Sequence, residues 1–225
     1  MKTKPRIPEG GAIEDTNQMS MEDYSDVMKK KLGRHYQSFA EFIIKNVAPV
    51  EKAKVLEIGP GPGWAGICLL KGRPDIRLDA IEASPDMIRV AEKNALEEGV
   101  KDRVDYRHGV VENMHMIPVP VYDLIISRES MHHWDDPQKG LMEISRVLKP
   151  GGKVYIQDHR RDIGLFARFI VNVLGPLMAG NMVKYWKSSI HASYTPEEVQ
   201  KMIDSISGID WHVKADLLDL AIISG

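Results

Sequence analysis

The sequence has little cysteine and no long apolar run, and each absence excludes a class of protein. Its single cysteine, Cys68, excludes an internal disulfide framework and a cysteine-based zinc site. The most apolar stretch, residues 164–180, is interrupted by Arg168 and the pair Gly175-Pro176, and it is too short to span a bilayer. The first residues are polar and lack the apolar core of a signal peptide. We therefore expect a soluble, cytoplasmic protein.

A large excess of charge of one sign is also absent. Lysine and arginine number 30 and aspartate and glutamate 32, which gives a formal net charge of −2. Such a chain has no general attraction to nucleic acid or to an anionic membrane, although a local basic patch is not excluded. The run Lys29-Lys30-Lys31 is interpreted as a solvated stretch rather than a nucleic-acid contact, because lone charge runs seldom bind. No nucleic-acid partner is expected.

What is present is an alternation of short apolar segments with amphipathic ones. Proline follows a helix-capping residue at Ser84 and at Asp136, and Thr195 begins a capping box. Strands separated by helices form a mainly parallel sheet, whereas the last two, too close for a crossover helix, pair antiparallel or sit apart. The expected strands are residues 54–58, 76–82, 103–107, 122–127, 153–157, 211–215 and 217–223. This pattern predicts an α/β fold with a doubly wound seven-stranded sheet, mostly parallel with an antiparallel last strand, and helices on both faces.

Two segments fall outside this alternation. Residues 1–46 are predicted to form an N-terminal tail, up to about residue 18, followed by a helical cap. Residues 47–225 are predicted to form one main domain. Within it, residues 164–193 form an apolar insertion, which is either a lid helix packed on the core or the wall of a hydrophobic pocket.

The most informative segment is a glycine-rich turn between a strand and a helix, at residues 59–63. Glycine at every second position lets a ligand touch the main chain, and the helix that follows offers free N–H donors. Glu82, at the end of the next strand, lies where doubly wound folds hold a ribose diol. The dinucleotide fingerprint is not met, because Trp64 stands where its third glycine belongs, and no Gly-Lys-Ser/Thr phosphate loop is present. A purely structural turn is the alternative, but with Glu57 the pattern favours a nucleoside-containing ligand.

With its other motifs, the sequence resembles the class I S-adenosylmethionine-dependent methyltransferases, whose folds are Rossmann-like. The resemblance covers roughly residues 38–225 and is closest to the small-molecule group that includes the quinone-biosynthesis C-methyltransferases. The acidic-x-Gly-x-Gly-x-Gly pattern and Glu82 are joined by four further segments: His108–Glu112, Tyr122–Ser127, Met131–Trp134 and Arg146–Gly152.

The resemblance implies S-adenosyl-L-methionine as the cofactor and assigns its contacts residue by residue. The turn would lie along the methionine and ribose, Glu82 would hold the ribose hydroxyls, and the loop after the third strand would meet the adenine. At the usual acidic adenine position this sequence has Val110, so Glu112 is the nearest alternative acceptor for the adenine amino group. The implied cofactor-binding residues are Glu57, Gly59, Pro60, Gly61, Gly63, Glu82, Ala83, Met87, Gly109, Val110, Val111, Glu112, Ser127 and Arg128.

The acceptor site is expected where the later strands end. His132 is the candidate general base or substrate contact, because a near-neutral pKa suits proton removal; the alternative is that it only packs the start of the next helix. Arg160 and Arg161 would clamp an anionic group or, equally, form an internal ion-pair cluster. Asp158 and His159 raise the possibility of a metal, which is rejected because adjacent side chains point in different directions. The remaining candidate acceptor contacts are Tyr24, Tyr36 and Tyr194.

Three functions are weighed against one another. The favoured one is methyl transfer to a small, partly hydrophobic acceptor. The second is a module that binds S-adenosylmethionine without turnover, to which the departure at Val110 points. The third, a nucleic-acid methyltransferase, is discounted because residues 127–130 lack the Asn/Asp-Pro-Pro-Tyr/Phe motif and the net charge is negative.

Overall fold

The structure, a computed structural model, describes residues 5–8, 19–176 and 183–224. The predicted N-terminal tail therefore lies largely outside the described residues, as does the part of the apolar insertion at 177–182. In chain order the helices are α1 (Met21–Phe42), η2 (Ile43–Val47), α2 (Trp64–Gly72), α3 (Pro85–Glu97), η3 (Lys101–Arg103), η4 (Met131–His133), α4 (Pro137–Val147), α5 (Leu165–Phe169), η5 (Ile170–Leu174), α7 (Val183–Ala192) and α8 (Pro196–Asp204). The strands are β1 (Lys54–Ile58), β2 (Arg77–Glu82), β3 (Val104–His108), β4 (Tyr122–Arg128), β5 (Leu148–His159), β6 (Trp211–Ala215) and β7 (Asp219–Ser224).

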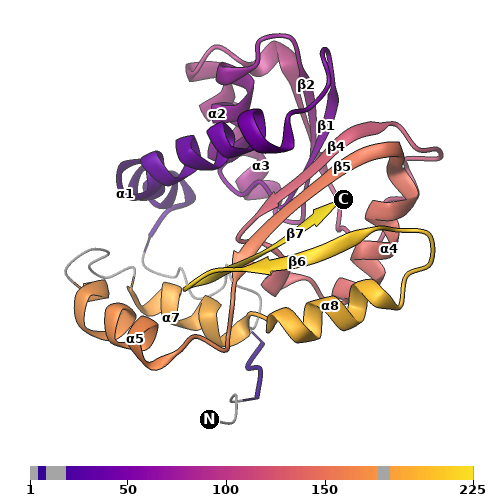
Figure 1. Ribbon diagram of the computed structural model, residues 1–225. Helices are drawn as coiled ribbons and strands as arrows, with labels where there is room; N and C mark the ends of the chain where they lie inside the picture. Colours follow the sequence, from indigo (N-terminus) through magenta and orange to yellow (C-terminus); the bar gives the residue numbers. More distant parts are fainter. Residues whose placement is uncertain (1–4, 9–18, 177–182, 225) are drawn as a thin grey trace.

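The seven strands form one sheet in the order β3-β2-β1-β4-β5-β7-β6 (Figure 1). The strands from β3 to β5 pair parallel, and β7 runs antiparallel to both β5 and β6. The prediction of a doubly wound, mostly parallel sheet with an antiparallel last strand is confirmed. The chain leaves β1 in one direction across the sheet and returns to β4 on its other side, so the carboxyl ends of β1 and β4 flank a topological switch point.

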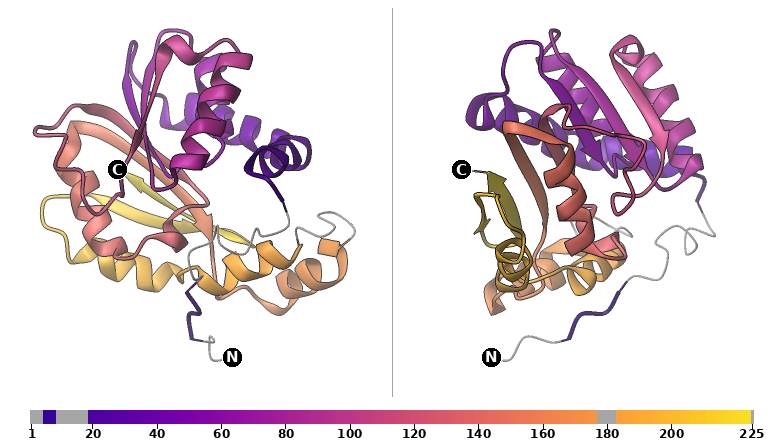
Figure 2. Two further views of the ribbon diagram at one scale, coloured as in Figure 1. Left: turned by 180° about the vertical axis from the view of Figure 1, so that it is seen from behind. Right: turned by 90° about the vertical axis from the view of Figure 1, so that its right-hand side faces the viewer.

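Helices cover both faces of the sheet (Figure 2). On one face, α1, α2 and α3 bury a cluster around Phe39, Trp64 and Leu124. On the other, α4 and α8 bury a cluster around Leu56, Ile125 and other strand residues. Strand side chains alternate between these two clusters, as the pleat requires. The capping signals hold: Ser84 and Asp136 cap α3 and α4, and Thr195 makes a full capping box with Glu198.

Helix α1 packs on α2 and α3 as part of the wall of the domain. Its Ser25 is buried, and its Oγ accepts hydrogen bonds from Trp64 Nε1 at 3.2 Å and from Asn94 Nδ2 at 2.9 Å. Buried polar contacts of this kind fix one helix against another. We therefore expect α1 to be as protected as the core, and a separate role for residues 1–46 as a cap stays a prediction.

Candidate functional site

The glycine turn after β1, residues 59–63, lies at the switch point, and only its middle glycine has free space beside it. Gly59, Gly61 and Gly63 all have positive φ, at 62°, 53° and 83°. A Cβ on Gly59 would collide with the Ser130 side chain and one on Gly63 with the Tyr106 hydroxyl, whereas a Cβ on Gly61 would meet nothing within 4 Å. The turn is thus packed at both ends and open in its middle, which is a surface that a ligand can approach closely.

The side chain of Glu82, at the end of β2, is hydrogen-bonded to this turn. Its Oε2 accepts a hydrogen bond from Gly61 N at 2.9 Å and its Oε1 accepts one from Ser84 N at 3.0 Å. Burial raises the pKa of this carboxyl, although the hydrogen bonds from Ser84, Gly61 and Ala83 oppose the effect. Each oxygen keeps lone pairs for further donors, so Glu82 braces the turn and still presents a carboxylate at the open side.

Glu57, on β1 beneath the turn, is a buried carboxyl with one oxygen unpartnered. Its Oε2 has no hydrogen-bond partner, and a Cβ at Gly66 would lie 2.2 Å from that atom. Burial raises the pKa of Glu57 to about 8; the Gly66 N–H bond works against this rise and the nearby Glu82 adds to it. The carboxyl is therefore largely protonated at neutral pH, as a neutral group suited to an apolar surrounding.

This assignment predicts a pH-dependent stability in the cofactor-free protein. Because the pKa of Glu57 is higher in the folded than in the unfolded chain, its contribution is complete below about pH 4.5 and is lost as pH rises to about 8. The variant Glu57→Gln, which keeps the shape without titrating, should remove roughly 3–5 kcal/mol of this decline. Urea unfolding from pH 4.5 to 9 measures it, and an unchanged slope in the variant would contradict it.

The loop after β3, predicted to meet the adenine, starts beside Glu82. Gly109 N donates to the Glu82 carbonyl at 3.0 Å, and His108 Nε2 lies 3.1 Å from the Ala83 carbonyl. Val111 is buried, whereas Val110 is 44% exposed. Glu112, the predicted substitute acceptor, already accepts a hydrogen bond from Asp136 N at 3.2 Å through Oε1. The exposed Val110 therefore offers an apolar surface, and Glu112 keeps acceptor capacity beyond the one hydrogen bond that it already accepts.

At the end of β4, charged and aromatic side chains meet. Ser127 is fully buried and donates to the Ile58 carbonyl at 2.9 Å, which ties β4 to β1 at the switch point. Arg128 pairs with Glu129 at 2.7 Å and its guanidinium lies 4.8 Å from the ring centre of Tyr36. The structure thus brings Tyr36 to the β4 end, and burial raises the pKa of its phenol. Tyr24, also on α1, is half-buried.

His132 is held in a charge-paired arrangement that sequence reasoning missed. Its Nδ1 lies 2.7 Å from Asp158 Oδ1, and its backbone N donates to Asp158 Oδ2, also at 2.7 Å. Because an ionised carboxylate only accepts, Nδ1 carries a hydrogen, and in the neutral imidazole the lone pair is then on Nε2. That Nε2 is buried and has no hydrogen-bond partner. Asp158, considered from the sequence only as a metal ligand, is instead the residue that orients this imidazole.

A second histidine–aspartate pair stands beside the first. His159 Nδ1 lies 2.8 Å from Asp219 Oδ1, and the rings of His132 and His159 are stacked with centres 6.3 Å apart. Burial lowers the pKa of His159, but the Asp219 hydrogen bond and the charges of Glu129, Asp219 and Asp158 outweigh it and raise the pKa to about 9. Burial likewise acts to raise the pKa of Asp158, and the two histidines outweigh it and lower it. The His159 imidazole is therefore cationic at neutral pH and lies beside the buried ring of His132.

The predicted clamp of Arg160 and Arg161 is not supported by their contacts. Arg160 makes a bidentate pair with Asp162 at 2.8 and 2.9 Å and donates to the Asp216 carbonyl. Arg161 is buried, donates to the Ser193 carbonyl and pairs with Glu198. Both guanidinium groups are thus used internally, which was the alternative interpretation, because each lies beside a carboxylate of its own loop or of α8.

Arg6 and Ile7, near the N-terminus, contact residues of η4 and α7 next to the site. Arg6 donates to the His132 carbonyl at 2.8 Å and to the Ala192 carbonyl, and its guanidinium lies 4.4 Å from the ring centre of Tyr194. Ile7 N donates to the His191 carbonyl at 3.1 Å. Arg6, which no motif marks, therefore contacts both the His132 main chain and the Tyr194 ring, and the role of Tyr194 at the acceptor stays a prediction.

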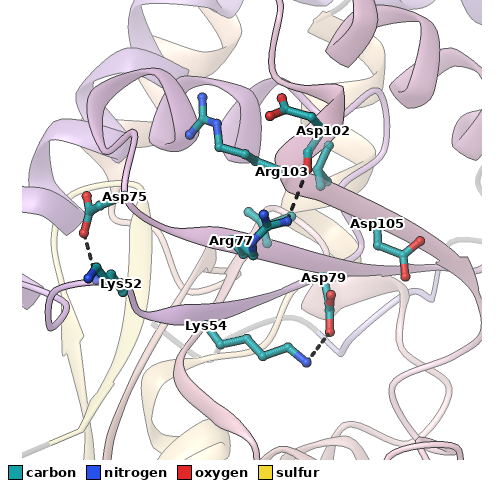
Figure 3. Close-up of a pocket in the computed structure, with 10 residues that line it drawn as sticks. Lys52, Lys54, Asp75, Arg77, Asp79, Asp102, Arg103 and Asp105 are labelled. Atoms are coloured by element: carbon teal, nitrogen blue, oxygen red, sulfur yellow. Dashed lines mark hydrogen bonds and ion pairs between the residues drawn. The ribbon is translucent and has the colours of Figure 1, made fainter.

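A cavity lies elsewhere, among the amino-terminal ends of β1, β2 and β3 (Figure 3). It encloses about 550 Å³ and is lined by four acidic and four basic side chains, among them the ion pair of Lys54 and Asp79 at 3.1 Å. Ligands of open α/β sheets bind at the opposite, carboxyl edge of the strands. Because its acidic and basic side chains neutralise one another, we interpret this cavity as a solvated surface feature and not as the cofactor site. Within the described residues, no group of three or more histidine, cysteine, aspartate or glutamate side chains could hold a metal ion.

Comparison with known proteins agrees with this geometry. A family model described as a methyltransferase domain matches residues 56–156. An uncharacterized methyltransferase of Bacillus subtilis, YdaC, is 31% identical over 126 residues, which are 56% of this chain and 67% of the relative. Ubiquinone biosynthesis O-methyltransferases of Xylella fastidiosa and Maricaulis maris are each 30% identical, over 58% and 62% of this chain. The match spans only about half of these two relatives, 51% and 54% of their lengths.

Solved structures extend the comparison to the whole chain. A candidate S-adenosyl-L-methionine-dependent methyltransferase from Methanococcus maripaludis is 26% identical, with a TM-score of 0.73 over 100% of this chain and 96% of that one. The plantazolicin methyltransferase BpumL, solved with SAH, is 17% identical with a TM-score of 0.64 over 91% and 88%, and shares the fold. With the seven-stranded sheet, the glycine turn and Glu82 at its switch point, these matches show that the chain belongs to the class I S-adenosylmethionine-dependent methyltransferases.

Proposed function

We propose that this methyltransferase methylates the oxygen of a small, partly hydrophobic hydroxyl compound, with His132 as the general base. The observation that carries the proposal is the buried, unpartnered Nε2 of an imidazole whose Nδ1 is held by Asp158 at 2.7 Å. Oxygen acceptors carry a proton that must leave during attack, and a positioned base supplies a place for it. An acceptor atom that carries no proton, such as a thioether sulfur, would need no such base.

The residues around the glycine turn fit the cofactor. The open space at Gly61 admits a ligand against the main chain, and the Glu82 carboxylate faces that space as an acceptor for ribose hydroxyls. Ala83, Met87 and the exposed Val110 would line the adenine, and the chain around Ser127 and Arg128 would meet the methionine end. When bound, S-adenosylmethionine supplies a methyl group already activated by a sulfonium, so the protein needs mainly to align the acceptor and exclude water.

Beside the acceptor, His132 and Asp158 would together take up the proton that leaves the acceptor hydroxyl. The acceptor hydroxyl proton passes to His132 Nε2, and the imidazolium that forms is stabilised by the ionised Asp158. Asp158 also fixes the ring tautomer, so the lone pair stays on Nε2. The neighbouring His159, cationic at neutral pH because its pKa is raised to about 9, favours negative charge on the acceptor oxygen.

Two observations support a partly hydrophobic acceptor that is methylated on oxygen. The chain beyond Asp158 leads into an apolar cluster of Ile163, Ala167, Val171 and Ile190, which would favour a partly hydrophobic molecule. Two relatives carry names that state O-methylation in ubiquinone biosynthesis, which supports transfer to oxygen.

The test supplies a methyl-labelled cofactor and a small-molecule extract, and reads products by mass spectrometry. We expect labelled products whose fragments place the methyl group on oxygen. His132→Gln should lower the rate about 100-fold or more at unchanged cofactor affinity, whereas the neighbouring His133→Gln should change it little. Calorimetry with S-adenosylmethionine separates the alternatives: cofactor binding without any labelled product would indicate a binding module, and label on nitrogen or carbon would overturn the assignment of oxygen.

A further inference from the structure

The insertion after β5 lies in a stretch without acidic residues. Between Asp162 and Glu197 the sequence has 34 positions, 163–196, with no aspartate or glutamate, although the whole chain has 32 acidic residues in 225. The same stretch carries Arg168, Lys184 and Lys187. A near-neutral protein therefore has one segment whose formal charge is only positive, and whose described part forms α5, η5 and α7 (Figure 1).

The outer face of α5 and η5 is apolar and exposed. Ala167 and Val171 point inward, where they pack with Ile163 and Ile190. The side chains on the outer face are large and apolar, with exposed fractions from 72% to 40%: Leu165, Phe166, Phe169, Val173 and Leu174. Large apolar side chains gathered on one exposed face mark an interaction surface rather than ordinary solvent-facing residues.

Beside this face, a cationic groove runs between the two helical segments. It encloses about 280 Å³ and takes Arg168, Val171 and Asn172 from one helix and Lys187, Ile190 and His191 from the other. Each helix thus contributes a cation, then an aliphatic residue three positions on, and a polar residue four positions on, which is the spacing of one helical face. Arg161, which also lines the groove, is paired with Glu198, so the unbalanced positive charge of the groove comes from Arg168 and Lys187.

The apolar face and the cationic groove together indicate which kind of partner binds here. A second copy of this chain docked about a two-fold axis would bring the same cations face to face, which is unfavourable. A nucleic acid would use the cations and leave the phenylalanines exposed. An anionic lipid surface uses both, because in-plane amphipathic helices insert apolar side chains at the acyl boundary while lysine and arginine meet the headgroup phosphates.

We propose that α5, η5 and α7 dock this protein on the surface of a membrane rich in anionic lipid. Leu165, Phe166 and Phe169 enter the interface, and Arg168 and Lys187 bind headgroup phosphate. No helix of the described chain is long and apolar enough to cross a membrane, so the contact lies in the plane of the surface. The inference goes beyond the proposed function; combined with it, docking would bring the His132 site near acceptors dissolved in lipid, since α7 contacts η4.

The experiment is co-sedimentation of the full chain with vesicles of phosphatidylglycerol and phosphatidylcholine, against phosphatidylcholine alone. We expect binding only to the anionic vesicles, weakening as salt is raised. Phe166→Ser with Phe169→Ser, and separately Arg168→Gln with Lys187→Gln, should each reduce binding about tenfold or more. Matched controls are Leu96→Ser, a leucine 70% exposed on α3, and Lys30→Gln with Lys31→Gln on α1; both should bind as the parent does.

Three results of the sedimentation experiment would overturn the proposal. They are equal binding to both vesicle types, no binding to either at low salt, and equal losses in the control variants. A change of oligomeric state in the phenylalanine variant, read by light scattering without vesicles, would also overturn it by showing that the face joins copies of the chain. Cofactor affinity, measured by calorimetry on the same variants, should stay at the parent value, so a failure of docking is distinguishable from a failure of the proposed methyl transfer.

Discussion

Gly61→Val is expected to abolish cofactor binding while leaving the fold in place. The Cβ that valine adds would meet no protein atom within 4 Å, so the side chain starts in open space. The same space is where a cofactor would lie against the turn, and a branched side chain there would exclude it. Affinity for S-adenosylmethionine, measured by calorimetry, should fall roughly 100-fold or more.

The backbone at Gly61 requires a matched control. Its φ of 53° is left-handed, so any valine there costs about 1–3 kcal/mol of stability whether or not a ligand binds. Gly151 has φ 75° and equally open surroundings, but it lies at the start of β5, away from the carboxyl edge of the sheet. Gly151→Val should therefore lose similar stability and keep full affinity. Normal binding by Gly61→Val would mean that the turn is only structural.

The fold could be predicted from the sequence wherever local signals set it. Strands β1 and β6 have the bounds expected from the pattern, and the caps at Ser84, Asp136 and Thr195 begin helices as expected. The strand expected at residues 153–157 starts too late, because β5 begins at Leu148, directly after α4 ends at Val147, and includes Pro150-Gly151-Gly152. Proline and glycine at the edge of a strand carry the same sequence signal as a helix stop.

The candidate site was predictable only in part, because its chemistry depends on pairs distant in sequence. The motif around His132 indicated the strand end, but not that Asp158, 26 residues later, would face it. A neighbouring pair of parallel strands, β4 and β5, brings the two together, and side-chain direction at a strand end cannot be read from periodicity. Arg6 has no sequence signal, since its hydrogen bonds are with the main-chain carbonyls of His132 and Ala192.

Asp158→Asn should lower the rate constant of methyl transfer by about 10²–10⁴ without changing cofactor affinity. An amide at this position cannot accept hydrogen bonds from both the His132 backbone N and Nδ1, which the carboxylate now accepts at 2.7 Å each. The imidazole would then favour the tautomer with hydrogen on Nε2, which cannot take the acceptor proton. Asp219→Asn is the matched change in the neighbouring pair with His159, and it should lower the rate less than about tenfold.

A double-mutant cycle separates this positioning role from a loss of local structure. If Asp158 acts only through His132, then His132→Gln with Asp158→Asn should be no slower than the worse single variant, because the second change removes a partner of a base that is already gone. Multiplied losses would mean that Asp158 acts elsewhere, for example by anchoring η4 through the His132 backbone N–H. Hydrogen exchange at residues 131–134 reports that anchoring directly. Equal protection of these amides in parent and Asp158→Asn, together with a non-additive loss of rate, would assign to the carboxylate the single task of keeping the lone pair on Nε2.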